Sequence, residues 1–349
     1  MSYRTLSLIT TIIVCLASCS RNAGGTKYVH EPNDYLSITD TVTATKVVCN
    51  LSALRPRNLL ISNNHLVVVD QSKNNVFNVY PLPLTGEGFS TIHYGKGPEE
   101  IIDPDYIGIK DYGSGIIVAD KDNYLKTFSI TGQSVHLIDK ERLFREAGFQ
   151  PGLFKLGNKI LEYNDKREVN NYEYHVLSSD GNEEYIGAVP EWDDGITTKK
   201  SGLYYTNLRA IHPNGKLFAE FFWRFRRVRI LDDKGNVLSE TAINYPSSSN
   251  LIPDSEGVYI TYGGIPCASK TRIVQLAQNE FVYKKTGDIS PRTISEFQIW
   301  DWEGHMLRRF IIKERLDLFT VDFKTGTFYG IDPAKEDVIF KADISNLLK

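Results

Sequence analysis

Short hydrophobic runs recur along the chain, each followed by a polar turn and a second run in which hydrophobic and polar residues alternate. Both kinds of run are rich in β-branched and aromatic residues, which favours strands over helices. The pattern therefore predicts an all-β protein built from repeated strand pairs. Six copies can be aligned: the first runs begin at Leu66, Ile116, Ile160, Leu217, Phe281 and Phe328, and their partners at Val76, Tyr124, Tyr172, Arg227, Phe297 and Val338.

Glycines mark the tight turns between these strands. Gly132, Gly181, Gly235 and Gly304 each follow a polar residue, and glycine supplies the positive φ of hairpin turns. Equivalent turns lie about 50 residues or more apart, a spacing typical of a four-stranded blade. Stacking such sheets radially buries both faces of the hydrophobic runs. We therefore expect a six-bladed β-propeller of antiparallel blades over residues 27–349; a β-sandwich or an irregular β-barrel is the alternative.

The sixth copy ends near Lys349, one strand short of a blade. We expect a segment between Lys27 and Leu51, such as Tyr35–Ile38, to supply the missing outer strand and close the ring, because closure protects sheet edges. One helix is predicted from its N-cap Asp139 to Ala147, with a glycine just past its end. It would connect the second and third blades.

Composition narrows the class of partner. The 349 residues include 40 Lys and Arg and 43 Asp and Glu, which gives a net charge of −3. This balance does not suit a phosphate backbone, so no nucleic acid partner is expected. Hydrophobic residues make up 41% and charged residues 24%, as in ordinary globular proteins.

The N-terminus predicts where the protein is located in the cell. Arg4 precedes the hydrophobic run Leu6–Ala17, which is too short to cross roughly 30 Å of hydrocarbon and indicates a signal peptide over residues 1–18. Its end, Leu16-Ala17-Ser18-Cys19, resembles the bacterial lipobox, which implies cleavage before Cys19 and lipidation of that residue. Residues 19–26 would then form a flexible tether. The alternative is an ordinary signal with a chance cysteine.

The tether carries no acidic cluster just after Cys19, whereas surface-displayed lipoproteins of some bacteria often carry one at that position. This favours an outer-membrane lipoprotein facing the periplasm and leaves the cell surface open. Later segments lack 18 consecutive apolar residues, so we expect a soluble body that the lipid attaches to the membrane. Cys49 and Cys267 could pair in an oxidising compartment, but burial as separate thiols is favoured.

The segment Ile92–Glu100 resembles the glycine-rich link that follows the first blade in TolB-like six-bladed propeller lipoproteins of Bacteroidetes. The strand-Asp-turn units at Asp70, Asp120 and Asp332 are also similar, whereas Glu99 stands where a second glycine is common. The resemblance implies a six-bladed propeller fold and a location in the cell envelope. It brings no catalytic residue, because members of the family are mostly of unassigned function.

The chemical motifs are weak. Gly95-Lys96-Gly97-Pro98 is a poor phosphate cradle because Pro98 has no N–H and no helix follows, so it is interpreted as a turn between blades. The recurring Asp residues line a cavity or accept backbone N–H bonds, and their recurrence favours the second role. No zinc-like His or Cys spacing and no G-x-S-x-G motif occurs. No catalytic residue, metal ligand or cofactor is predicted, although a Ca²⁺ in the central channel stays open.

Two aromatic segments are candidate ligand contacts. Arginines and rings interleave over residues 221–229, and could stack on sugars or pair with acidic groups; alternatively the Arg stems cover neighbouring rings. Aromatic residues in the link between the third and fourth blades suit carbohydrate or protein contacts, or pack the link down. The candidates are Trp192, Tyr204, Tyr205, Trp223, Arg224 and Arg226.

These observations favour a lipid-anchored binding or assembly module of the cell envelope, with an envelope protein or a glycan as partner and its ligand undefined. The alternative is a hydrolase or lyase acting on a glycan or lactone in the central channel. Fold analogy supports both. A calcium-sized ion or a cluster of inward carboxylates with shifted pKa at the channel mouth would favour the enzyme, and a channel plugged by apolar side chains with an exposed aromatic patch would argue against it.

Overall fold

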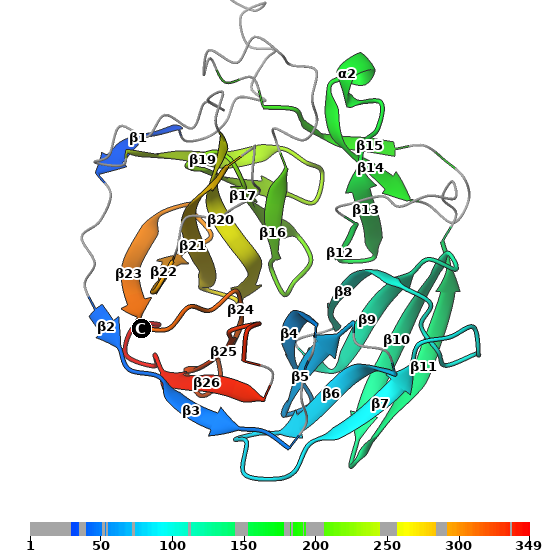
Figure 1. Ribbon diagram of the computed structural model, residues 1–349. Coiled ribbons are helices and arrows are strands. Elements are labelled where there is room, and N and C mark those ends of the chain that lie inside the picture. Colours follow the sequence, from blue (N-terminus) through cyan, green and yellow to red (C-terminus); the bar gives the residue numbers. More distant parts are fainter. Residues whose placement is uncertain are drawn as a thin grey trace, which may run out of the picture.

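The computed structural model is an all-β propeller of six blades around a central axis, as the sequence predicts (Figure 1). The structure describes residues 29–34, 40–50, 53, 55–71, 74–110, 113–143, 153–177, 182, 184–190, 192, 206–244, 257–283, 292–335 and 337–349. Each blade contains four antiparallel strands, and the first strands of neighbouring blades contact one another around the axis. The predicted signal peptide, Cys19 and the tether lie outside these residues.

The strands follow the chain blade by blade. The first three blades consist of β4 (Pro56–Ser62), β5 (His65–Asp70), β6 (Asn75–Pro81) and β7 (Phe89–His93); β8 (Pro104–Lys110), β9 (Gly115–Asp120), β10 (Tyr124–Thr131) and β11 (Ser134–Arg142); and β12 (Phe154–Leu156), β13 (Lys159–Tyr163), β14 (Tyr172–Leu177) and β15 (Glu184–Ala188).

The other three blades consist of β16 (Asn207–Ile211), β17 (Leu217–Phe222), β18 (Arg227–Asp232) and β19 (Val237–Asn244); β20 (Gly257–Ala268), β21 (Ile273–Tyr283), β22 (Ser295–Trp300) and β23 (Met306–Ile312); and β24 (Leu318–Asp322), β25 (Thr327–Ile331) and β26 (Val338–Asp343). The sixth blade takes its fourth strand from the N-terminal part of the chain.

The N-terminal strands run round the outer rim of three blades, in blue in Figure 1. β1 (Val29–Asp34) pairs in parallel with β19, and β2 (Asp40–Val42) pairs in parallel with β23. β3 (Thr45–Val48) pairs antiparallel with β26 and completes the sixth blade. Closure within residues 27–51 is therefore confirmed, but the strand that closes the ring is β3. The segment named for this role, Tyr35–Ile38, lies outside the described residues.

The hydrophobic core lies between the blades. On β5, Val67 and Val69 pack against Ile116 of the second blade, while Leu66 and Val68 pack towards the sixth. Both faces of this second strand are buried, which explains its unbroken hydrophobic run. The first run of each pair aligned in the sequence is thus the second strand of its blade, and its partner is the third strand. The innermost strand of each blade comes before both in the chain.

The helix predicted over 139–147 is wrong at its start. Asp139–Arg142 belong to β11, which pairs with β10 from Thr131↔Ser134 to Tyr124↔Arg142 across one bulge. The hairpin continues the ladder here, and its backbone hydrogen bonds outweigh a local N-cap signal. Residues 144–147 lie outside the described residues. Among those described, the helix is α2 (Arg167–Asn170), and no helix there is long and apolar enough to cross a membrane.

Candidate functional site

A pocket of about 360 Å³ opens at the axis, on the face where the first strand of each blade turns into the second. We call it the axial pocket. All six innermost strands contribute to its wall, so it exists only because the ring is closed. Its lining residues are Asn58–Ile61, Tyr106–Gly108, Lys155, Arg209, Ile211, Pro213, Ile265–Ser269 and Thr320–Lys324.

A bulge in the innermost strand of the fifth blade shapes one wall. The pairing of β20 with β21 shifts between Gly263 and Cys267, and Gly264 lies in the left-handed region with φ of 67°. Bulges re-aim side chains next to functional sites. Ile265 sits in this bulge with 45% of its surface exposed, although it belongs to an inner strand. The axial pocket therefore offers a hydrophobic side chain that the fold itself does not cover.

Sequence reasoning passed over these residues. A signal was present, because Gly263-Gly264-Ile265-Pro266 places two glycines and a proline inside a strand-like run. Glycine inside a strand marks a bulge or a close approach, and proline is confined to edges and bulges. The segment lies on an innermost strand, whereas the six strand pairs aligned in the sequence are the second and third strands of the blades.

The charged side chains of the axial pocket are mainly cationic. Lys155 lies on β12, Arg209 on β16 and Lys324 in the turn after β24. The carboxylate of Asp322 also lines the pocket, but it accepts hydrogen bonds from the Lys324 N–H (3.0 Å) and the Thr325 hydroxyl (2.7 Å) of its own turn. The Asp322 carboxylate is therefore already hydrogen-bonded. The three cations come from three different blades.

Aromatic rings hold Arg209 in place. Its guanidinium carbon lies 4.7 Å from the ring centres of both Phe154 and Tyr163, and 5.9 Å from that of Tyr174. Such cation–π contacts are stronger in desolvated surroundings. The Tyr174 hydroxyl donates a hydrogen bond to the Glu220 carboxylate. Burial raises the pKa of Glu220, against the opposing influence of Arg229, the Tyr174 hydrogen bond and Arg209.

The thiol in the pocket wall is inert at neutral pH. Burial raises the pKa of Cys267 to about 11, and its Sγ lies 3.7 Å from the Thr320 hydroxyl. Burial likewise raises the pKa of Cys49 to about 11. Neither cysteine is in a disulfide, as the sequence analysis favoured. Because the thiolate is the nucleophilic form, Cys267 does not suit covalent catalysis here.

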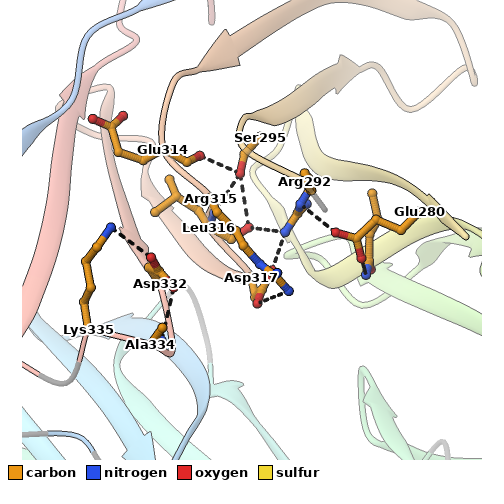
Figure 2. Close-up of polar contacts among 11 residues, drawn as sticks. Glu280, Arg292, Ser295, Glu314, Arg315, Leu316, Asp317, Asp332, Ala334 and Lys335 are labelled. Carbon is orange, nitrogen blue, oxygen red and sulfur yellow. Dashed lines mark hydrogen bonds and ion pairs between the residues drawn. The ribbon is translucent and has the colours of Figure 1, made fainter. Parts of the chain in front are cut away.

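The opposite end of the axis carries a buried ion cluster, drawn in Figure 2. Arg292 Nε lies 3.1 Å from Glu280 Oε1, and the same guanidinium pairs with Asp317 and donates to the Leu316 carbonyl. Burial lowers the pKa of Arg292, while Glu280 and Asp317 oppose that change. Ser295 Oγ accepts from the Leu316 N–H at 2.7 Å. The cluster joins the fifth blade to the link that enters the sixth, and its charges are paired, although Arg292 Nε and Nη1 and Glu280 Oε1 form no hydrogen bond.

The recurring Asp residues have structural roles, as their recurrence indicated. Asp70 accepts the Arg55 N–H at 2.8 Å, and Asp120 accepts the N–H groups of Ile102 and Asp103. Asp332 accepts the N–H of Ala334. Two of the three carboxylates thus hold the link that enters their own blade, and the third holds the turn that follows it.

The glycine-rich link after the first blade wraps around an internal carboxylate. Gly97 N–H donates to Glu100 Oε2 at 2.6 Å. A Cβ on Gly95 would stand 2.1 Å from the same oxygen, so a larger residue there would displace the Glu100 carboxylate. The link therefore uses its donor on its own side chain, which agrees with its interpretation as a turn.

The structure places some of the predicted aromatic and arginine candidates together. Trp192 Nε1 donates to Glu240 at 2.7 Å, and its ring packs edge-on against Phe222 and Phe225. Arg227 and Arg229 lie 4.7 Å and 5.3 Å from the Trp192 ring. Trp192 thus pins its link onto the fourth blade, away from the residues that line the axial pocket.

The other candidates occupy the β17–β18 turn. Trp223 and Arg224 are half-buried there, and Arg226 is buried. The Trp223 carbonyl accepts the Thr261 N–H at 2.8 Å, which joins this turn to β20. Tyr204 and Tyr205 lie outside the described residues. Ligand binding at these positions stays a prediction.

Asp301, Glu303 and His305 bring three possible metal-ligand atoms within 4.8 Å of one another on a turn of the fifth blade. Asp301 Oδ1 accepts the N–H groups of both Glu303 and His305, and its other oxygen lies 3.0 Å from His305 Nδ1. The trio is accounted for as a turn stabilised by an Asp side chain.

Solved structures show where this fold occurs. A protein of Bacteroides fragilis NCTC 9343 that is described as exported is 12% identical, with a TM-score of 0.53 over 89% of this chain and 99% of its own. A member of the DUF4221 family from Bacteroides vulgatus ATCC 8482 is 13% identical, with a TM-score of 0.57 over 86% and 96%. At this identity the likeness shows the fold alone. No family model and no curated protein matches the chain.

Proposed function

We propose that this protein is a lipid-anchored binding module of the cell envelope that holds a small ligand in the axial pocket. The observation that carries the proposal is the convergence of all six inner strands on a mostly hydrophobic cavity whose wall exposes Ile265. Ligand sites are characteristically concave and apolar with a few placed polar groups, and the cavity lies within their usual range of about 300–1,000 Å³.

Binding suits the pocket better than catalysis. Asp322 is held by its own turn, and Ser269 Oγ accepts the Arg272 N–H at 3.0 Å. The Cys267 thiol has a pKa of about 11. A nucleophile needs an adjacent base or a depressed pKa, and no described lining residue combines these. The described lining residues include one carboxylate, that of Asp322, whereas Ca²⁺ is coordinated by about six to eight oxygen atoms.

The envelope address is supported by the signal-like N-terminus and the lipobox at Cys19. The Bacteroides fragilis protein of the same fold, which is described as exported, also supports it. We propose that Cys19 carries the anchor in the outer membrane, with the propeller on the periplasmic side. An envelope protein or a glycan is the proposed partner of the assembled module.

Native mass spectrometry of the protein purified from its own envelope tests the proposal. We expect a small molecule to remain bound to the wild type and to be lost from Ile265→Asn, which places an amide in the hydrophobic wall of the pocket. Ile138→Asn is the matched control, because Ile138 is 55% exposed on the outer strand of the second blade. Equal retention by all three proteins, or no bound molecule in the wild type, would count against binding in the axial pocket.

A further inference from the structure

We infer that the axial pocket selects an anionic amphiphile, a small molecule with a hydrophobic body and one acidic group such as a carboxylate. This inference rests on the proposed function, which places a ligand in the pocket. It goes further by naming the chemistry that the pocket recognises, from the charges of Lys155, Arg209 and Lys324 and from the hydrophobic wall around them.

Among the described residues, the nearby Glu220 carboxylate partly balances Arg209, whereas the two lysines have no such partner. No described carboxylate forms an ion pair with Lys155 or Lys324, and Asp322 is engaged in its own turn. Three positive side chains line one partly enclosed space and repel one another. The repulsion is stronger between the half-buried Lys155 and Arg209 than with the exposed Lys324, because Coulomb energies grow as the local dielectric constant falls. A bound anion would relieve this repulsion, so the pocket favours a ligand that carries negative charge.

Arg209 is prepared to receive an acidic group. Its Nη1 is buried and has no hydrogen-bond partner, while Phe154 and Tyr163 fix the plane of the guanidinium. The nearby Glu220 carboxylate accepts the Tyr174 hydroxyl. A guanidinium forms a rigid fork that matches a carboxylate or phosphate, and a buried donor without a partner is costly. The unused N–H of Arg209 is therefore the group we expect to orient the head of the ligand.

The hydrophobic wall defines the rest of the ligand. Leu59, Leu60 and Ile107 line the cavity from the first two blades, and Ile265 and Val321 line it from the last two. A volume of about 360 Å³ is near the lower limit of ligand pockets. The ligand that fits is a single small amphiphile, and a polymer chain or a strongly polar sugar does not match this wall.

Octanoate and octanamide separate the charge from the hydrophobic body, because they share a chain and differ in the acidic group. We expect ligand-observed NMR titration of the wild type to show about tenfold tighter binding of octanoate, since ionised hydrogen bonds are about twice as strong as neutral ones. Lys155→Met and Lys324→Met should each lower the octanoate affinity severalfold and leave octanamide nearly unchanged. Lys216→Met, on the same face but outside the lining, is the control.

The double variant Lys155→Met/Lys324→Met and the variant Arg209→Gln complete the series. Both should bring the two affinities close together; if Arg209→Gln fails to fold, as shown by circular dichroism, the lysine double variant decides. Equal binding of both probes to the wild type, weakened by Ile265→Asn, would overturn the charge selection and leave the binding pocket standing. Absence of binding, or binding that Ile265→Asn does not change, would overturn both.

Discussion

At the scale of single residues, this protein buries a charged pair in its second blade, where β9 ends at Asp120. Lys126 is 1% exposed, and its Nζ lies 2.6 Å from Asp120 and 2.9 Å from Asp122 and donates to the Glu100 carbonyl at 2.7 Å. Asp120 is fully buried as well. A buried carboxylate is tolerated when it is paired and hydrogen-bonded, and both conditions hold here. The sequence signal for this arrangement was the recurrence of Asp after a hydrophobic run.

Removing the lysine should therefore destabilise the protein strongly. We expect Lys126→Met to cost about 3–5 kcal/mol in the free energy of unfolding, because it leaves buried charge uncompensated. Adding Asp120→Asn should recover part of that loss, and urea denaturation of the two single variants and the double variant would measure the coupling. Strictly additive losses would show that the pair contributes no interaction energy of its own.

The two half-buried thiols should react slowly. A cysteine of ordinary pKa near 8.5 is about a quarter ionised at pH 8, whereas one of pKa about 11 is ionised in roughly one molecule per thousand. We expect Cys49 and Cys267 to react with a disulfide reagent at least a hundredfold more slowly in the folded protein than in urea. The rate should rise with pH well past 9. Rapid labelling of the folded protein at pH 8 would contradict the raised pKa values.

At the scale of elements, the sequence predicted strands in proportion to how far the fold buries them. Both faces of β5 and β9 are covered by neighbouring blades, so their hydrophobic runs are unbroken and were found. The innermost strands mix buried positions with partly exposed ones and carry polar residues such as Lys155 and Arg209. No periodic signal marks a strand of that kind. The axial pocket escaped prediction for the same reason, since it is built from these strands.

Pairing partners escaped prediction as well. Sequence length showed that the sixth blade lacked a strand, but nothing in the pattern separated β3 from the segments before it. β1 and β2 add a fifth strand to blades that were already complete. Such parallel additions at an edge depend on distant backbone geometry, which a local pattern does not contain.

The three N-terminal strands should contribute unequally to stability. A chain that begins at Ala44 loses β1 and β2 but keeps β3, and we expect it to stay folded with a modestly lower Tm. A chain that begins at Cys49 also loses β3, which leaves the edge of β26 unpaired and the ring open. We expect that chain to aggregate or to lose most of its thermal stability, as measured by calorimetry. Equal Tm values would show that ring closure does not depend on β3.

At the scale of the whole molecule, the proposed anchor on Cys19 would be tied to the ring at the fourth blade. Val29 begins β1 on the outer edge of that blade and follows Cys19 by ten residues. An extended chain spans at most about 3.6 Å per residue, so a lipid on Cys19 would hold this edge within roughly 35 Å of the membrane surface. The axial pocket would then work close to the bilayer, where amphiphiles concentrate.

The anchor itself is the last prediction. We expect Cys19→Ala to move the protein from the membrane fraction to the soluble fraction, because the body would keep its fold but lose the acyl chains that make attachment stable. Cys15→Ala is the matched control, since it makes the same change inside the segment that cleavage would remove. Fractionation with immunodetection, with the mass of the mature N-terminus measured in parallel, gives the readout. If Cys19→Ala sediments with the membrane as the wild type does, attachment depends on the propeller surface rather than on a lipid.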